Sequence, residues 1–284
     1  MKKLKLMIIV GLLATCQQSP AQERVFEEHI SRQFDVVDGS TLAIYNVFGS
    51  IDVEGYDGNR ILLEIDKKLI AENANELAKA KEEFKLNFDQ KTDSLIVFIK
   101  EPRDSRPDRN YRNWEHKEIK YTYHLEFKVK VPRSLNLVAV TVNDGEVLVR
   151  NVDGKLKIHN VNGGISLTNV SGITYAHTVN GDVDITYASQ PKGESSYYTL
   201  NGDLTVFYPQ NLSADCDYKS FNGELFTDFP EVTMLPTTVS KNIKENDNTI
   251  RYKLESNTRF RIGNGGSQLH FETFNGNVYI KQKS

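Results

Sequence analysis

The 284-residue sequence lacks most of the features that mark common functional classes of protein. It has two cysteines and one tryptophan, and its 35 Lys and Arg nearly balance 38 Asp and Glu. It contains no Ser-His-Asp elbow, phosphate-binding loop or paired-cysteine motif, and no basic stripe with interleaved aromatic residues indicates a nucleic-acid surface. We therefore predict a protein that is not an enzyme, with no catalytic residue, no cofactor and no nucleic-acid partner.

The apolar run at the start of the chain is typical of an export signal. Three lysines within the first five residues precede an apolar stretch at 6–13 that is too short to span a bilayer, and residues 19–21 (Ser-Pro-Ala) form a small-residue cleavage site. We predict a signal peptide at 1–21 and a mature chain at 22–284, exported to the periplasm, the outer-membrane surface or the extracellular medium. Removal of the three lysines leaves 32 basic against 38 acidic residues, a net charge of about −6.

The scarcity of cysteine bears on anchoring and on stability. Residues 13–16 (Leu-Ala-Thr-Cys) resemble a bacterial lipoprotein box, and cleavage there would leave a lipidated Cys16 on the membrane. This is the one route to membrane association that we expect. Ordinary cleavage after Ala21 leaves Cys216 as the single cysteine, so that no internal disulfide can form. We interpret Cys216 as a buried thiol.

What the sequence does contain is a glycine every nine residues. Apolar side chains follow four of the five glycines at two and four residues on, which is a strand period, and another apolar side chain recurs at seven residues on, where the phase changes. A meander of hairpins joined by Asn-Gly turns would keep strict alternation, whereas a solenoid can change phase at each corner. The pattern favours a solenoid with regular nine-residue repeats over 141–187. The glycines are Gly145, Gly154, Gly163, Gly172 and Gly181.

A kernel of the form apolar-Asn-Gly-polar-apolar extends the repeats beyond this array. It recurs at 200–204, 221–225 and 274–278, and an earlier cognate lies at 47–53. We therefore predict one continuous all-β domain over 22–284, a right-handed parallel β-helix or closely related β-solenoid. The unit at Gly172 departs from the pattern, because Thr174 and Ala176 take its apolar positions. A local bulge or register slip is expected there.

Other segments flank the array. Expected strands cover 28–37, 41–45, 50–53, 60–69, 94–100 and 119–131. One short surface helix is expected at about 74–84, with Asn73 as its cap, and 232–248 is a polar insertion without period. The charged segment 101–120 is typical of a solvated loop. Alternatively it is a binding loop that presents Tyr111 and Trp114.

Two groups of side chains invite a chemical interpretation. Outward carboxylates at Asp182, Asp184 and Asp203 could form an acidic patch for acid-base chemistry or a cation, or simply a solvated face. Calcium-binding β-rolls require Gly-Gly-x-Gly-x-Asp repeats, which are missing here. If two repeats make one turn, His159 and His177 stack, but no third ligand has matching spacing. We predict no metal site.

The chain resembles the bacterial putative-adhesin family, exported proteins with a β-solenoid domain of unknown function that are common in the Bacteroidetes. The resemblance is carried by residues 46–57 (Asn-Val-Phe-Gly-Ser-Ile-Asp-Val-Glu-Gly-Tyr-Asp), the helix at 74–84 and the Asn-Gly-Asp-Val-x-Ile kernel at 180–185. It covers about 47–280. It implies the solenoid fold and an adhesive role, and it carries over no catalytic residue.

These observations lead to one expected function and two alternatives. We expect an exported, non-enzymatic cell-envelope or surface protein, an adhesin or scaffold that acts through an extended solenoid surface. The first alternative is a carbohydrate-binding module that uses Trp114 and the tyrosines. The second is a polysaccharide-active β-helix enzyme with its site on the acidic face. The expected partner is a surface glycan or an envelope protein.

Overall fold

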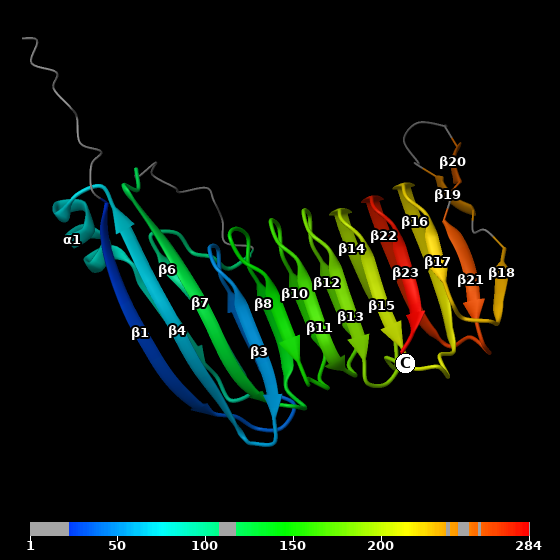
Figure 1. Ribbon diagram of the computed structural model, residues 1–284, viewed down its shortest axis with the longest axis horizontal. Coiled ribbons are helices and arrows are strands. Elements are labelled where there is room, and N and C mark those ends of the chain that lie inside the picture. Colours follow the sequence, from blue (N-terminus) through cyan, green and yellow to red (C-terminus); the bar gives the residue numbers. More distant parts are fainter. Residues whose placement is uncertain (1–22, 108–117, 237–238, 244–249, 255–256, 284) are drawn as a thin grey trace, which may run out of the picture.

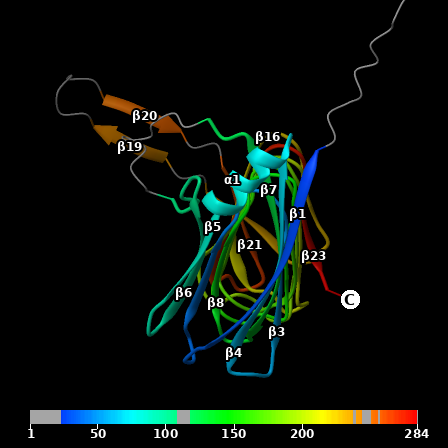
Figure 2. The ribbon, with the colours of Figure 1, turned by 90° about the vertical axis from the view of Figure 1, so that its left-hand side faces the viewer.

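The structure is a computed structural model that describes residues 23–107, 118–236, 239–243, 250–254 and 257–283. Its strands lie side by side along the long axis of the molecule, with the one described helix at the N-terminal end (Figure 1). Viewed along that axis, two sheets form opposite sides of the body, and a hairpin of β19 (Val239–Ile243) and β20 (Ile250–Leu254) projects from it (Figure 2). The predicted signal peptide, with Cys16, lies outside the described residues.

The first sheet has ten strands among the described residues. In spatial order they are β1 (Arg24–Asp35), β4 (Arg60–Ala71), β7 (Tyr121–Pro132), β3 (Ile51–Tyr56), β9 (Val147–Arg150), β11 (Ile165–Val170), β13 (Val183–Tyr187), β15 (Leu204–Tyr208), β23 (Val278–Gln282) and β17 (Leu225–Thr227). From β7 to β17 the strands are parallel, whereas β1 and β4 pair antiparallel at the N-terminal end.

The second sheet has eleven strands in the part of the chain that the structure describes. In spatial order they are β18 (Val232–Leu235), β21 (Thr258–Ile262), β16 (Ala214–Asn222), β22 (Ser267–Asn275), β14 (Ser195–Asn201), β12 (Thr174–His177), β10 (Leu156–His159), β8 (Asn136–Val140), β2 (Thr41–Tyr45), β6 (Ser94–Glu101) and β5 (Lys85–Gln90). The strands from β16 to β6 are parallel, and antiparallel strands close both ends of this sheet.

The chain alternates between the two sheets, and this confirms the solenoid. Consecutive strands from β8 to β15 lie in opposite sheets, and Ile165 pairs with Val147 on one side and Val183 on the other. Paired residues are eighteen positions apart, so two nine-residue repeats make one turn. Within each repeat, the alternating apolar residues belong to a strand of one sheet. The change of phase falls at the corner where the chain crosses to the other sheet.

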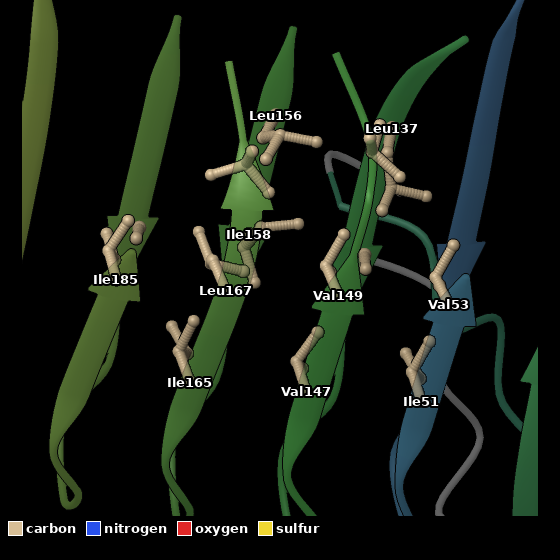
Figure 3. Packing of buried hydrophobic residues seen from close by; sticks show 14 of the residues in the cluster. Ile51, Val53, Leu137, Val147, Val149, Leu156, Ile158, Ile165, Leu167 and Ile185 are labelled. Carbon is tan, nitrogen blue, oxygen red and sulfur yellow. The ribbon is translucent and has the colours of Figure 1, made fainter. Parts of the chain in front are cut away.

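Apolar side chains at the predicted inward positions fill the space between the sheets. Ile165 and Leu167 are each 1% exposed, whereas Ser166 and Thr168 point outward. Figure 3 shows the same inward direction for the equivalent residues of neighbouring turns. Cys216 is a buried free thiol, as predicted, and burial raises its pKa above the usual value.

The position seven residues after the glycine is buried at every second corner only. Val152 and Val170 are buried, but the equivalent Val161 is half-buried and the neighbouring Asn160 is buried in its place. The Asn160 amide donates to the carbonyl oxygen of Gly145 at 3.0 Å, which satisfies a polar group in the interior. One kind of corner therefore buries a valine side chain, and the other buries an asparagine side chain whose amide is hydrogen-bonded.

The bulge expected near Gly172 is not at that position. Thr174 pairs with Leu156 in an unbroken register, and the irregularity lies earlier, between Thr168 and Val170. Thr174 fits an apolar position because its hydroxyl donates to the Gly172 carbonyl oxygen at 3.0 Å. Asn169 adopts φ of 56° at the irregularity, a left-handed conformation that Asn tolerates.

The helix forms where the sequence predicts it. Helix α1 spans Ala74–Glu83, and the Asn73 side chain accepts a hydrogen bond from the Glu76 backbone N–H at 2.9 Å. Ala80 faces the core, and α1 contacts the antiparallel end of the first sheet. In the described part of the chain, no helix is both long and apolar enough to cross a membrane.

The antiparallel strands at the two ends were not predicted. The repeat pattern implies parallel pairing throughout, but β1, β4, β5, β18 and β21 run antiparallel to their neighbours. Strand β5 was not predicted, and β18 and β19 lie in the segment 232–248, which the sequence indicated only as a polar insertion without period. Antiparallel pairing at an end protects the open edge of a solenoid, a role that a nine-residue repeat cannot encode.

Candidate functional site

Tyr111 and Trp114, which the alternative interpretation of the charged segment predicts to contact a ligand, lie in 108–117, outside the described residues. The preceding part of the charged segment packs on the second sheet. The Arg106 guanidinium lies 3.6 Å from the centre of the Phe98 ring and 2.6 Å from the Asp104 carboxylate. This part of the segment is therefore folded onto β6 and is not the fully solvated loop that its charges suggest. The Arg106 guanidinium can pack on the Phe98 ring and still pair with the Asp104 carboxylate, so packing does not leave its charge without a partner.

The carboxylates of Asp182, Asp184 and Asp203 lie near one another on two successive turns, but two of them hold the fold together. The Asp182 Oδ1 accepts the backbone N–H of Asp203 at 2.8 Å, and the Asp203 Oδ1 accepts that of Asn277 at 2.7 Å. Partial desolvation, followed by the charge of Asp182, raises the pKa of Asp184. The described residues contain no group of three His, Cys, Asp or Glu that could hold a metal ion.

The outer face of the second sheet carries a row of polar rings. His159, His177 and Tyr198 share one register position on neighbouring strands, and the two imidazole centres are 5.4 Å apart at 82°. Burial, and then the charge of His177, lowers the pKa of His159 to about 4, and burial lowers that of His177. Both imidazoles are therefore uncharged at neutral pH, and the row can stack against another flat group.

A second row lies beside these rings. Tyr175 is paired in register with Lys157, and the Lys155 ammonium lies 5.3 Å from the centre of the Tyr175 ring. Together the two rows give a surface of tilted rings that offers aromatic faces and polar edges. The sequence predicted that the two histidines stack, but it did not place the tyrosines beside them. Tyr175 sits in the Gly172 unit, which departs from the apolar pattern, and Tyr198 lies beyond the regular nine-residue array.

A shallow hollow of about 410 Å³ lies on the first sheet between β3, β4, β7 and β9. Its charged side chains have partners within or beside the hollow: Arg150 lies 2.6 Å from Asp52, Lys130 lies 3.9 Å from Glu54, and Glu64 and Lys128 pair with His29 and Asp66. A ligand would have to displace these partners, so the hollow offers no uncompensated charge to attract one.

Most of the exposed large apolar side chains in the described part of the chain lie at the C-terminal end of the solenoid. Seven large hydrophobic residues are exposed among those described, and five belong to the last turns: Phe221, Phe226, Val232, Met234 and Phe274. We call these five residues the apolar end. Phe221 is 73% exposed and stacks on Phe274 with ring centres 4.7 Å apart at 4°. Such gathering is unusual on a protein that works alone.

A column of asparagines leads along the corner to the apolar end. Each Nδ2 donates to the Oδ1 of the asparagine in the preceding turn, at 2.8 or 2.9 Å. In spatial order the amide column is Asn143, Asn162, Asn180, Asn201, Asn275 and Asn222. The kernel residue before each asparagine points outward, which the sequence pattern alone did not reveal, and at the last two turns this residue is Phe274 and then Phe221.

These features define a β-solenoid whose distinguishing groups lie on its outer faces and at its C-terminal end. Residues 103–279 match the family model described as Toastrack DUF4097, and the chain belongs to this family. This confirms the resemblance carried by the sequence. No curated protein matches the chain.

Three solved structures are similar to this chain over 90% of its length. A putative cell adhesion protein from Clostridium sporogenes is 12% identical with a TM-score of 0.44, and all of that chain is covered. A putative adhesin from Bacteroides fragilis is 11% identical with a TM-score of 0.38, and 97% of that chain is covered. A putative lipid binding protein from Parabacteroides distasonis is 10% identical with a TM-score of 0.30, also with 97% of that chain covered.

Proposed function

We propose that the protein is an exported, non-enzymatic cell-envelope or surface protein, an adhesin or scaffold that binds a macromolecular partner through its solenoid. The observation that carries this proposal is the apolar end. Solenoids remain soluble when a terminal repeat presents a polar outer face, whereas this chain leaves Phe221 and Met234 73% and 65% exposed at its end. A partner that covers these side chains would remove apolar surface from water.

The chemistry of the acidic patch supports a binding role over catalysis. A general acid or base needs a carboxyl group that is free to exchange its proton with substrate. The carboxylates of Asp182 and Asp203 instead accept backbone N–H groups from the next turn. Export is supported by the lysines, apolar stretch and small-residue site within residues 1–21.

Co-sedimentation with cell-envelope fractions of the producing bacterium tests the proposal. We expect the mature protein to bind, and a Phe221→Ser, Phe274→Ser double variant to bind at least about tenfold less, because interface energy concentrates in exposed aromatic side chains. Val37→Ser is the matched control, since Val37 is 57% exposed but lies far from the apolar end. Equal sedimentation of the double variant and the native protein would contradict the proposal.

A carbohydrate-binding role is a second candidate, favoured by the rings on the second sheet. The face of Tyr175, His177 and Tyr198 offers flat stacking surfaces with hydrogen-bonding edges. Under this proposal Tyr111 and Trp114 add further aromatic contacts. A glycan array would test it: Tyr175→Ala with Tyr198→Ala, or removal of 108–117, should abolish any signal, whereas the Phe221→Ser, Phe274→Ser variant should retain it.

A further inference from the structure

Among the described residues, the first sheet ends before the second sheet does at the last turn of the solenoid. Beyond β16 the second sheet continues with the antiparallel strands β21 and β18, whereas the first sheet ends at β17 (Figure 1). Strand β17 comprises Leu225–Thr227 and pairs with β23 on one side only. In the described part of the chain, one edge of the first sheet is therefore open at the position where the next turn would begin.

Each kernel passes the same set of hydrogen bonds to the following turn. At 181–183, for example, the Gly181 N–H donates to the Asn201 carbonyl oxygen at 3.0 Å, and the Val183 N–H donates to that of Asp203 at 2.9 Å. A side-chain hydrogen bond runs in the opposite direction, from the following turn: the Asn201 Nδ2 donates to the Asn180 Oδ1 at 2.8 Å. These bonds define what a strand must offer to extend the solenoid.

The kernel at 221–225 makes these bonds backward but not forward. Toward the preceding turn, the backbone carbonyl oxygen of Asn222 accepts the Gly276 N–H at 3.0 Å, and that of Glu224 accepts the Val278 N–H at 2.9 Å. Toward the open side, four groups have no partner among the described residues. They are the Gly223 N–H, the Leu225 N–H, the Asn222 Oδ1 and the Glu224 carboxylate.

The apolar side chains of the last turn are exposed on the same side. Phe221 covers one face of Phe274, and Phe226 covers one face of Tyr279 with ring centres 5.1 Å apart at 13°. Each outer ring is itself left without a ring beyond it among the described residues. An added strand would thus gain ring contacts as well as main-chain hydrogen bonds.

We propose that β17 accepts an extended segment of another protein, added parallel to it as the next strand of the first sheet. The segment carries the kernel apolar-Asn-Gly-polar-apolar. Its asparagine donates to the Asn222 Oδ1 and continues the amide column. Its glycine is required because the equivalent residues leave no space: a Cβ at Gly202 or Gly223 would lie 2.2 or 1.8 Å from the carbonyl oxygen of the preceding glycine. The proposal rests on the proposed function and specifies its partner.

One position of the kernel is already filled. In earlier turns the glycine carbonyl accepts a hydroxyl from the next turn, as the Gly181 oxygen does from Thr199 at 2.8 Å. At the last turn the Tyr218 hydroxyl donates to the Gly223 oxygen at 2.9 Å. The partner segment therefore needs no threonine two positions before its asparagine.

A second copy of this chain is a poor source of the segment. Its described kernels are built into turns and paired on both sides, except for the one at 221–225. At the opposite end, β4 and β1 cover the first sheet as antiparallel strands, and β1 presents charged side chains along its edge. We therefore assign the partner segment to a different protein that has an unpaired kernel.

Fluorescence anisotropy with a labelled peptide provides the test. The peptide Thr-Val-Asn-Gly-Asp-Val-Asp-Ile-Thr reproduces residues 178–186, and we expect it to bind the mature protein in a saturable manner. Leu225→Pro removes one outward N–H at an edge, where proline is tolerated, and should weaken binding at least tenfold. Leu225→Ala keeps that N–H and should bind within about threefold of the native protein. Thermal melts confirm that both variants are folded.

Several results would overturn strand addition. They are absence of peptide binding, equal binding to Leu225→Pro, equal binding of a peptide with valine in place of its glycine, and a native dimer that Leu225→Pro dissociates, which would show that a second copy covers the edge. Envelope binding that depends on Phe221 but not on the Leu225 N–H would retain the proposed function and reject this proposal. Peptide binding without envelope binding would do the reverse.

Discussion

The Nδ2 of Asn180 donates to the Oδ1 of Asn162 at 2.8 Å, one full turn of the solenoid away. The Asn180 Oδ1 in turn accepts from Asn201 at 2.8 Å, so that one side chain ties three turns together. Because the amide column lies on the exposed corner, water competes for each of these bonds, and the column adds register more than it adds stability.

Asn180→Ala should lower the free energy of unfolding by about 1–2 kcal/mol, because it removes two bonds of the amide column. Asn222→Ala at the end of the column removes one bond and should cost less than about 1 kcal/mol. Urea denaturation of the two variants and the native protein measures both values. A larger loss for Asn222→Ala than for Asn180→Ala would show that the column does not act bond by bond.

Ile165→Asp should abolish cooperative folding, whereas Ser166→Asp should not. Ile165 is 1% exposed between the two sheets, and burial of a carboxylate among aliphatic side chains costs several kcal/mol. Ser166 points outward, where a substitution usually changes stability by less than about 0.5 kcal/mol. Thermal unfolding followed by circular dichroism distinguishes them, and equal melting temperatures would refute the inward register.

The repeat could be predicted from the sequence because each turn places the same residue type at the same spacing. A glycine must lie against the glycine of the neighbouring turn, and the alternation of apolar residues must change phase at each corner. Both requirements recur at a fixed spacing in the sequence. Contacts that occur once leave no such trace. The packing of Arg106 on Phe98 is one such contact, although the two residues are close in the chain. The antiparallel pairing of β21 with β16 and the outward stack of Phe221 on Phe274 also join segments that are far apart in the chain.

Gly181→Ala should destabilise the protein by about 3 kcal/mol or more. Gly181 has φ of 152°, and a Cβ there would lie 2.5 Å from the Gly163 carbonyl oxygen, so the variant has both backbone strain and a clash within the stacked turns. Gly39→Ala is the control, since Gly39 has φ of 74° with no atom within 4 Å of the added Cβ. It should cost roughly 1–2 kcal/mol from backbone strain alone. Guanidinium denaturation that gives equal losses would exclude the clash.

His29→Gln should reduce stability at acidic and neutral pH more than at alkaline pH. The His29 imidazole lies 2.7 Å from both the Asp66 and the Glu64 carboxylates, and these bonds raise its pKa above 6.5. A raised folded pKa gives stability that is complete below pH 6.5 and is lost as the pH rises through the folded value. Denaturation of the native protein and variant between pH 5 and 9 measures the difference, and a pH-independent difference would contradict the pairing.

His159→Gln should have the opposite pH dependence. Burial, and then the charge of His177, lowers the folded pKa of His159 to about 4, whereas the unfolded value is 6.5. The unfolded chain therefore binds the proton more readily, so this group's contribution to stability is complete above pH 6.5 and is lost as the pH falls toward 4. The native protein should lose stability over that range, and the variant should lose less.

Carboxylates titrate in both proteins, so the informative quantity is the difference between their unfolding free energies at each pH. A constant difference from pH 7 to pH 4 would show that His159 accepts its proton as readily in the folded protein as in the unfolded chain, and would contradict the half-buried row of rings.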